Sequence, residues 1–200
     1  MDKVIGPNQM AFVKGRQIND SFVIAKEVIH SWRKDDLGGI LVKLDFEKAY
    51  DNVDHNILFD VLRLMGFRSK WIEWLWDCIS TTRLSVLVNG SPTKKFWMER
   101  GLQQGDPLSP LLFNLVVEVL SRMLDKPRER GMIKGIGYRN DAIHINHLQF
   151  ADDTMLFLEP RMNYILHAKR ILRCFELASG LKINFHKSCL VKVGTKCLND

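Results

Sequence analysis

Two adjacent acidic residues, Asp152 and Asp153, lie between two short apolar runs in the second half of the chain. The flanking segments 147–149 and 154–158 are short and rich in apolar and aromatic residues, which predicts two strands joined by a tight turn at the acidic pair. Carboxylates held beside a buried sheet repel each other unless a cation compensates their charge. Mg²⁺ takes such oxygen ligands and keeps water or phosphate in its other positions. A solvent-exposed turn is the alternative, because Asp is common in turns.

A third acidic residue, Asp45, ends another predicted strand. Apolar residues alternate along 40–46 and give this strand one apolar face, so Asp45 is expected on the opposite face. Antiparallel pairing with the acidic hairpin could bring three carboxylates together at one edge of the sheet. Carboxylates so placed can hold two divalent ions, which lower the pKa of an attacking hydroxyl and neutralise triphosphate oxygens. The spacing along the chain does not by itself establish this convergence.

A loop rich in glycine and proline precedes the most apolar helix of the chain. Residues 101–110 contain two glycines and two prolines, which favours a stiff loop of defined shape. Ser109 is expected at the N-cap and Pro110 at the first helical position, with the helix running to about Leu124. Such a loop at a helix N-terminus can approach a phosphate or a base closely. An ordinary loop-to-helix junction has the same composition.

The remaining patterns predict an α+β fold. Further helices are expected at about 19–34, 54–64, 69–79 and 161–179. Further strands are expected at 83–88, 94–98 and 190–193. Asp54 is a plausible N-cap, and Asn89-Gly90 is a strong signal for a hairpin turn. Residues 125–140 are basic and are expected to form a solvated connector, with nucleic-acid contact as the alternative. The strands are expected to form an antiparallel sheet covered by helices on one face.

Two further predictions concern burial. The first helix, capped by Asn19 or Asp20, is expected to bury an apolar face made of Ile18, Phe22, Ala25, Ile29 and Trp32. The three tryptophans of the segment 69–79 are expected in the core or at contacts between domains. Their alternative role, as platforms for base stacking, is less favoured because large aromatic residues usually serve packing.

The composition fits a globular protein with a basic excess. The formal net charge is +6, which is compatible with a polyanionic partner without establishing one. The four cysteines form no CxxC pair and no zinc-like spacing, so free thiols in a reducing compartment are expected. The first residues lack a signal-peptide pattern, and polar residues interrupt the apolar stretch 108–124. An intracellular location, in nucleus or cytoplasm and without membrane contact, is the expectation.

Five blocks of the chain, taken in order, resemble the reverse transcriptase domain of non-LTR (LINE-type) retrotransposons, and most of all its plant versions. Residues 8–20 resemble the segment that closes the family's fingers region. The four palm motifs are matched by 43–51, by 101–110 with Phe113-Asn114, by 150–153, and by 180–184 with Lys187-Ser188. The match covers essentially the whole chain. It implies a polymerase palm over residues 39–200, preceded by the end of the fingers over residues 1–38.

The resemblance implies an RNA-directed DNA polymerase that transfers a nucleotide from a dNTP to a primer 3′-hydroxyl. Its implied partners are an RNA template, a DNA primer and the dNTP, and its implied cofactor is a pair of Mg²⁺ ions, with Mn²⁺ as a substitute. The positions that match the family's metal-binding and catalytic carboxylates are Asp45, Asp152 and, in a supporting place, Asp153. The backbone carbonyl of Phe46 would complete the metal shell.

Other matched positions carry implied roles in handling the nucleotide. Tyr50 matches an aromatic gate under the sugar, where a ring excludes a 2′-hydroxyl and favours dNTPs. Gln104 and Gly105 match the loop that touches the incoming nucleotide and the template. Lys187 matches a lysine proposed to protonate the leaving pyrophosphate, and its charge would also stabilise that group. Lys182 is a second candidate for this role.

The chain departs from the family's full domain at both ends. The family's domain begins earlier, with a basic fingers segment that grips the triphosphate, and it continues into a thumb. Full elements also carry an endonuclease upstream. The expectation is a truncated palm fragment with weak or no polymerase activity by itself, and with exposed apolar surface where other parts would dock. The alternatives are a non-catalytic, nucleic-acid-binding palm relic and an intron-maturase-like role in splicing.

Overall fold

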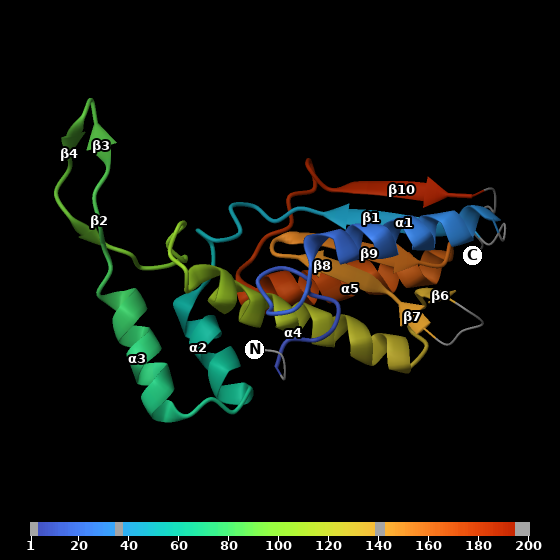
Figure 1. Ribbon diagram of the computed structural model, residues 1–200, viewed down its shortest axis with the longest axis horizontal. Helices are drawn as coiled ribbons and strands as arrows, with labels where there is room; N and C mark the ends of the chain where they lie inside the picture. Colours follow the sequence, from blue (N-terminus) through green and yellow to red (C-terminus); the bar gives the residue numbers. More distant parts are fainter. Residues whose placement is uncertain (1–3, 35–37, 139–142, 195–200) are drawn as a thin grey trace.

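A four-stranded antiparallel sheet organises the fold in the computed structural model, which describes residues 4–34, 38–138 and 143–194 (Figure 1). In spatial order its strands are β10 (Cys189–Val193), β1 (Gly39–Leu44), β9 (Asp153–Leu158) and β8 (His147–Phe150). The register places Ile40 opposite Leu158 and Leu44 opposite Thr154. The alternating apolar pattern of the sequence produced this sheet, and the α+β prediction is confirmed.

Helices cover both faces of the sheet, but unequally. The helices α2 (His55–Leu64), α4 (Ser109–Glu129) and α5 (Met162–Ser179) contribute to one large core with the face that carries Ile40 and Leu44. α1 (Ile18–Lys34) packs on the other face, where Trp32 meets Phe157 with ring centroids 5.9 Å apart. The prediction of helices on one face only is wrong, because the far end of the opposite face is also apolar. That face becomes polar toward Asp45, and the acidic end stays uncovered.

The first helix buries a different stripe from the predicted one. Asp20 lies within its first turn and accepts a hydrogen bond from the Gln17 amide at 3.3 Å, so it does not occupy the N-cap. Ile18 and Phe22 are 58% and 70% exposed. The buried residues are Ser21, Ala25, Val28 and Trp32. The sequence contained two candidate stripes, and contact with the sheet selected the one that includes small residues.

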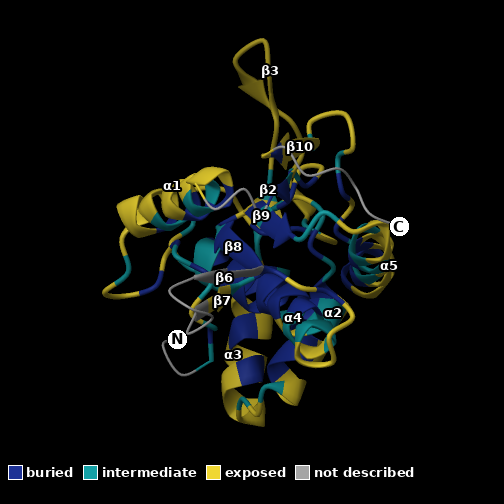
Figure 2. Ribbon diagram, turned by 90° about the vertical axis from the view of Figure 1, so that its right-hand side faces the viewer, coloured by how far each residue is buried: buried dark blue, intermediate teal, exposed yellow. Residues whose placement is uncertain are grey.

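A helical pair and a protruding hairpin lie at the other end of the molecule (Figure 1). α2 is capped by Asp54, whose carboxylate accepts from the Asn56 amide at 2.8 Å, which confirms that prediction. α3 (Ser69–Ser80) leads into four short strands: β2 (Arg83–Leu84), β3 (Leu87–Val88), β4 (Ser91–Pro92) and β5 (Phe96–Trp97). Asn89 and Gly90, with φ of 50° and 82°, form the predicted turn. Figure 2 shows the end of the hairpin around β3 as exposed.

The tryptophans of α3 are not buried in the core, which was one of the two packing roles predicted for them; contact with another domain stays a prediction. Trp71, Trp74 and Trp76 are 37%, 57% and 44% exposed. The helix instead buries a narrow stripe formed by Ile72, Leu75 and Ile79. These three aliphatic residues recur with the helical period and pack α3 against the core. The larger tryptophan rings lie outside this stripe and remain at the surface.

α4 begins and ends differently from the prediction. Leu108 occupies the N-cap position and Ser109 is the first helical residue, while the Asp106 carboxylate accepts from the Leu108 amide at 2.8 Å. The helix continues through Pro127 to Glu129, so residues 125–129 are not a connector. Pro127 lies in the last turn, where it costs the helix few hydrogen bonds. The connector's residues 139 and 140 lie outside the described part of the chain.

The remaining features include a predicted helix end and an unpredicted hairpin, whose first strand lies in the segment 125–140 that was expected to be a connector. α5 ends at Gly180, which adopts the left-handed conformation typical of a helix C-terminus (φ 73°). β6 (Ile136–Tyr138) and β7 (Ile143–Ile145) form a separate small hairpin. Cys78, Cys174 and Cys189 are free thiols, and Cys197 lies outside the described residues. Within the described ranges, no helix combines the length and apolar character that a bilayer span needs.

Candidate active site

Acidic residues from two separate strands meet at one end of the sheet. Because Leu44 faces Thr154 in the antiparallel register, the adjoining residues Asp45 and Asp153 lie at the same end of the sheet. Asp152 lies in the turn, directly after Ala151, whose φ of 52° reverses the chain. Asp45 is half-buried, whereas Asp152 and Asp153 are exposed.

One lysine partly compensates the charge of these carboxylates. Lys43 Nζ lies 3.4 Å from an Asp153 carboxylate oxygen, and both side chains are about half exposed. A pair so exposed contributes at most about 1 kcal/mol, so it does not cancel the repulsion between opposed acids. In the described part of the chain, no three His, Cys, Asp or Glu side chains lie close enough together to hold a metal ion.

Backbone geometry directs the Phe46 carbonyl toward the same edge. Phe46 forms an isolated antiparallel bridge with Ile183. The flanking hydrogen bonds run from the Glu47 amide to the Lys182 carbonyl and from the Asn184 amide to the Asp45 carbonyl, each at 2.8 Å. In such a pair the bridging residue's own N–H and C=O point away from its partner, here toward the acidic turn. Carboxylate and carbonyl oxygens are the ligands that hard divalent ions prefer, so the donor set fits Mg²⁺ or Mn²⁺.

Tyr50 lies beside these acids on the loop that follows β1. Its ring stacks on Phe113 of α4, with centroids 4.7 Å apart and an interplanar angle of 20°. Burial raises the pKa of the Tyr50 phenol above its usual value, and the negative charge of Asp152 raises it further. The phenol therefore stays protonated at neutral pH, and its ring forms a fixed wall next to the acidic turn.

The glycine-bearing loop 101–105 is fastened to the same region. The Leu102 amide donates to the Tyr50 carbonyl at 2.8 Å. Gln104 Nε2 donates to the Asp51 carboxylate at 3.3 Å. Gly105 has a φ of 90°, and no atom lies within 4 Å of the place where a Cβ would stand, so its backbone faces open space. The structure thus groups Tyr50, Gln104 and Gly105 on one rim next to the carboxylates.

Gly101→Ala is expected to destabilise the protein by about 2–5 kcal/mol. The residue has a φ of 87°, and an added Cβ would lie 2.7 Å from the Asp51 carbonyl oxygen. Backbone strain of about 1–2 kcal/mol and overpacking of about 1–3 kcal/mol both contribute. Gly105→Ala is the matched control, since it adds strain without a clash and should cost only about 1–2 kcal/mol. Urea unfolding measures both, and equal losses would contradict the close approach at Gly101.

The two candidate lysines lie on the segment that flanks Asp45 from the other side. The Asp45 amide donates to Ser188 Oγ at 3.1 Å, which ties the 184–188 turn to the end of β1. Lys187 lies in this turn, and its amide donates to the Asn184 carbonyl at 3.2 Å. The side chains of Lys187 and Lys182 are both exposed. Each is attached to a backbone that contacts the 45–47 segment.

A buried amide that sequence reasoning missed holds the acidic turn in place. Gln9 is 2% exposed, and its Oε1 accepts from the Ala151 amide at 3.1 Å and from the Ala11 amide at 3.0 Å. The backbone beside it pairs with β8, since the Met10 amide donates to the Gln149 carbonyl at 2.9 Å. The segment 8–20 matched the family, but no local feature assigns Gln9 to a turn 142 positions away.

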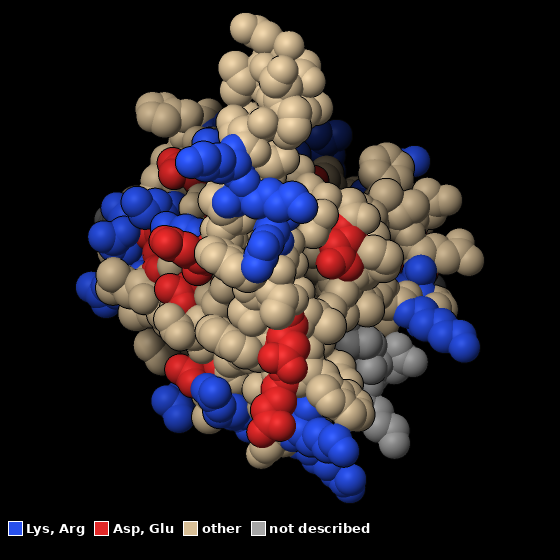
Figure 3. Space-filling model, turned by 90° about the vertical axis from the view of Figure 1, so that its left-hand side faces the viewer, with Lys and Arg blue, Asp and Glu red and all other residues tan. Residues whose placement is uncertain are grey.

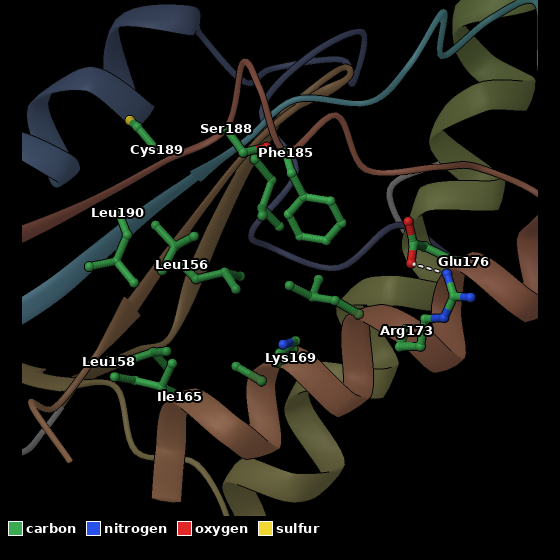
Figure 4. A pocket seen from close by; sticks show the side chains of 14 residues that line it. Leu156, Leu158, Ile165, Lys169, Arg173, Glu176, Phe185, Ser188, Cys189 and Leu190 are labelled. Carbon is green, nitrogen blue, oxygen red and sulfur yellow. Dashed lines mark hydrogen bonds and ion pairs between the residues drawn. The ribbon is translucent and has the colours of Figure 1, made fainter. Parts of the chain in front are cut away.

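An apolar hollow of about 550 Å³ lies between α5 and the sheet face that carries Leu44 (Figure 4). Leu156, Leu158 and Ile165 point into it, and Lys169 and the Arg173–Glu176 ion pair (3.0 Å) lie at its margin. Phosphoryl chemistry needs charged and polar groups that converge on one point. The acidic edge offers them and the hollow does not, so the candidate site is the edge.

Comparisons with known proteins show the family to which the chain belongs. An antiparallel sheet that carries carboxylates at the ends of neighbouring strands, with helices behind it, is the architecture of a polymerase palm. The family "Reverse transcriptase (RNA-dependent DNA polymerase)" matches residues 1–198. The chain belongs to this family.

The chain is also similar to individual proteins of this family and to solved structures. It is 32% identical over 187 residues to a Pol polyprotein from the retrotransposable element R2DM of Drosophila melanogaster; the match covers 94% of this chain and 17% of that protein. It is 49% identical over 71 residues to a mitochondrial protein of Arabidopsis thaliana, covering 36% of this chain and 58% of that protein. Apo telomerase from Candida tropicalis has a similar fold, with a TM-score of 0.68 at 14% identity, over 94% of this chain and 37% of that one.

The Drosophila protein comes from a non-LTR retrotransposon, which confirms the predicted kinship with that class of elements. The plant match covers only about a third of the chain. The chain spans only 17% of the Drosophila polyprotein. Members of the reverse transcriptase family generally use divalent metal ions.

Proposed function

We propose that residues 39–200 form the palm of an RNA-directed DNA polymerase and that residues 1–38 are the end of its fingers. The observation that carries this proposal is the juxtaposition of Asp45 with the Asp152-Asp153 turn at an uncovered sheet edge. Asp45 and Asp152, with Asp153 in support and the Phe46 carbonyl, would hold two Mg²⁺ ions. Such ions, when bound, lower the pKa of the primer 3′-hydroxyl and neutralise the triphosphate oxygens.

The groups around this edge would position the incoming dNTP. The Tyr50 ring, held by its stacking on Phe113, would form the floor under the sugar. The backbone at Gly105 faces open space and would allow a base or phosphate to approach, while the amide of Gln104 is held by Asp51. Lys187, or Lys182 in its place, would stabilise the negative charge of the departing pyrophosphate. An RNA template and a DNA primer are the corresponding partners.

Tyr50→Ala is expected to relax the exclusion of ribonucleotides. Removing the ring removes the clash with a 2′-hydroxyl, so the ratio of kcat/KM for dTTP to that for UTP should fall by about tenfold or more. Tyr50→Phe is the matched control, because it keeps the ring and should leave the ratio unchanged. The ratio cancels any general loss of activity. An unchanged ratio in the alanine variant would remove Tyr50 from this role.

The proposal is tested by primer extension on an oligo(rA)–oligo(dT) duplex with dTTP and Mg²⁺, comparing the wild type with Asp152→Asn. Extension that disappears in the variant supports the proposed polymerase. Equal extension by both proteins overturns the assigned carboxylates. No extension by either protein, with both folded by circular dichroism, overturns catalysis by this chain and leaves a non-catalytic palm.

A further inference from the structure

A groove of about 770 Å³ lies at the base of the protruding hairpin, next to the candidate active site. One wall comes from the end of the hairpin and includes Lys95, Phe96 and Trp97. The other wall includes Asp51 and Leu102. The groove has the volume of sites that bind organic ligands, about 300–1,000 Å³. Because the Leu102 amide donates to the Tyr50 carbonyl, one end of the groove adjoins the proposed nucleotide site.

An exposed tryptophan dominates the hairpin wall. Trp97 is 53% exposed, and Phe96 beside it is 46% exposed. The Arg83 guanidinium lies over the Trp97 ring at 4.3 Å from its centroid, and Arg83 pairs with Trp97 in the β2–β5 register. This contact fixes the ring in one orientation while half of its surface remains accessible. A fixed, accessible aromatic ring is a surface on which a nucleic-acid base can stack.

Basic residues surround this ring. Segment 83–100 contains four basic residues and one acidic residue, Glu99, which gives it a net charge of +3. Lys95 and Arg100 line the groove. Glu99 and Asp51 also line it, and the Asp51 carboxylate already accepts a hydrogen bond from Gln104. Figure 3 shows Lys and Arg side chains gathered next to the protruding hairpin on this face.

We propose that this groove binds a single-stranded segment of nucleic acid, with a base stacked on Trp97 and backbone phosphates contacting Lys95 and Arg100. Aromatic rings interleaved with basic side chains are typical of single-strand binding surfaces. A protein interface fits less well, because lysine is depleted from the centres of such interfaces. Binding in the groove does not require catalysis. The assignment of the strand as the template rests on the proposed polymerase function, because the groove adjoins the rim formed by Tyr50 and Gln104.

Fluorescence anisotropy tests the groove without any catalytic step. The probes are fluorescein-labelled single-stranded RNA and DNA of about 12 nucleotides, within the usual site size, titrated with the protein in EDTA and without dNTP. Trp97→Leu is expected to weaken binding at least about fivefold, the lower range of base stacking. Trp97→Phe should retain most of the affinity. Lys95→Gln should lower the slope of log K against log salt by about 0.7.

Matched controls remove the same kinds of residue elsewhere on the surface. Trp74 of α3 is 57% exposed and also carries a cation over its ring, Lys70 Nζ at 5.4 Å, so Trp74→Leu should leave binding unchanged. Lys26 is exposed on α1, and this helix lies away from the protruding hairpin (Figure 1), so Lys26→Gln should leave the salt slope unchanged. If Trp97→Leu loses its fold by circular dichroism, Trp97→Phe and Lys95→Gln decide the outcome.

Three outcomes would contradict the proposal that this groove binds single-stranded nucleic acid. They are equal effects of Trp97→Leu and Trp74→Leu, a salt slope unchanged in Lys95→Gln, and no binding by the wild type at low salt. This failure is distinct from failure of the polymerase proposal. If the protein binds single strands through Trp97 but extends no primer, the groove proposal stands and the polymerase proposal fails. If the wild type extends primers but Trp97→Leu binds single strands as well as the wild type does, the polymerase proposal stands and the groove proposal fails.

Discussion

Asp45→Asn and Asp152→Asn are each expected to reduce Mg²⁺-dependent primer extension by about 10³-fold or more. Each substitution keeps the shape of the side chain but removes a charged ligand from the metal edge. Metal-ion stabilisation of the transition state amounts to several kcal/mol, and each 1.36 kcal/mol changes the rate about tenfold. Asp153→Asn should reduce the rate far less, because the Asp153 carboxylate is exposed and already paired with Lys43 at 3.4 Å.

A metal-binding measurement separates this effect from loss of fold. Titration with Mn²⁺, followed by electron paramagnetic resonance, should show weaker binding by Asp45→Asn and Asp152→Asn. Asp60→Asn is the control, since Asp60 is an exposed carboxylate paired with Arg63 at 2.6 Å on α2. It should change neither the binding of Mn²⁺ nor the rate of extension. An Asp153→Asn variant as impaired as Asp45→Asn would show that all three carboxylates bind the ions equally.

Lowering the pH from 7 to 5.5 is expected to reduce the free energy of unfolding by about 1 kcal/mol through one histidine. His147 is fully buried, and its burial lowers the pKa of the imidazole to about 3, with the nearby Arg128 charge acting in the same direction. Its hydrogen bonds fit the neutral ring. Nδ1 contacts the side-chain oxygen Oδ1 of Asn146 at 2.8 Å, and Nε2 accepts from Ser121 Oγ at 2.8 Å. Protonation of Nε2 would break the second bond.

The sign follows from linkage between protonation and folding. The unfolded chain binds a proton to His147 near pH 6.5 and the folded chain only near pH 3. The contribution to stability is therefore fully present above pH 6.5 and decreases by about 1.4 kcal/mol per pH unit as the pH falls toward 3. Burial raises the carboxyl pKa values of Glu118 and Asp125, which acts in the opposite direction at lower pH.

Urea unfolding at pH 7 and pH 5.5 measures this difference. His147→Asn should be less stable at pH 7 but should lose most of the pH dependence over this range. His30→Asn, which replaces an exposed histidine of α1, should keep the pH dependence of the wild type. A wild-type protein whose stability is unchanged across the range would contradict a neutral, buried His147.

The sequence determined the features that depend on neighbours a few residues apart. Alternation along 40–46 located β1, the Asp54 carboxylate located the start of α2, and Asn89-Gly90 located the hairpin turn. Glycine at 180 located the end of α5. Each is a local preference of the backbone or a hydrogen bond within one turn, and such interactions can be read from short segments. The motifs around Asp45 and Asp152 also identified the family.

The tertiary structure alone decided which of these residues meet. The register of β1 with β9 brings Asp45 and Asp153 to the same end of the sheet, and Gln9 reaches the Ala151 amide across 142 positions of sequence. The packing of the core left Trp74 at the surface and left Trp97 accessible beside a basic groove. The physical reason is that these contacts join distant segments. Their geometry depends on the register of the strands and on how the whole core packs, which no local pattern encodes.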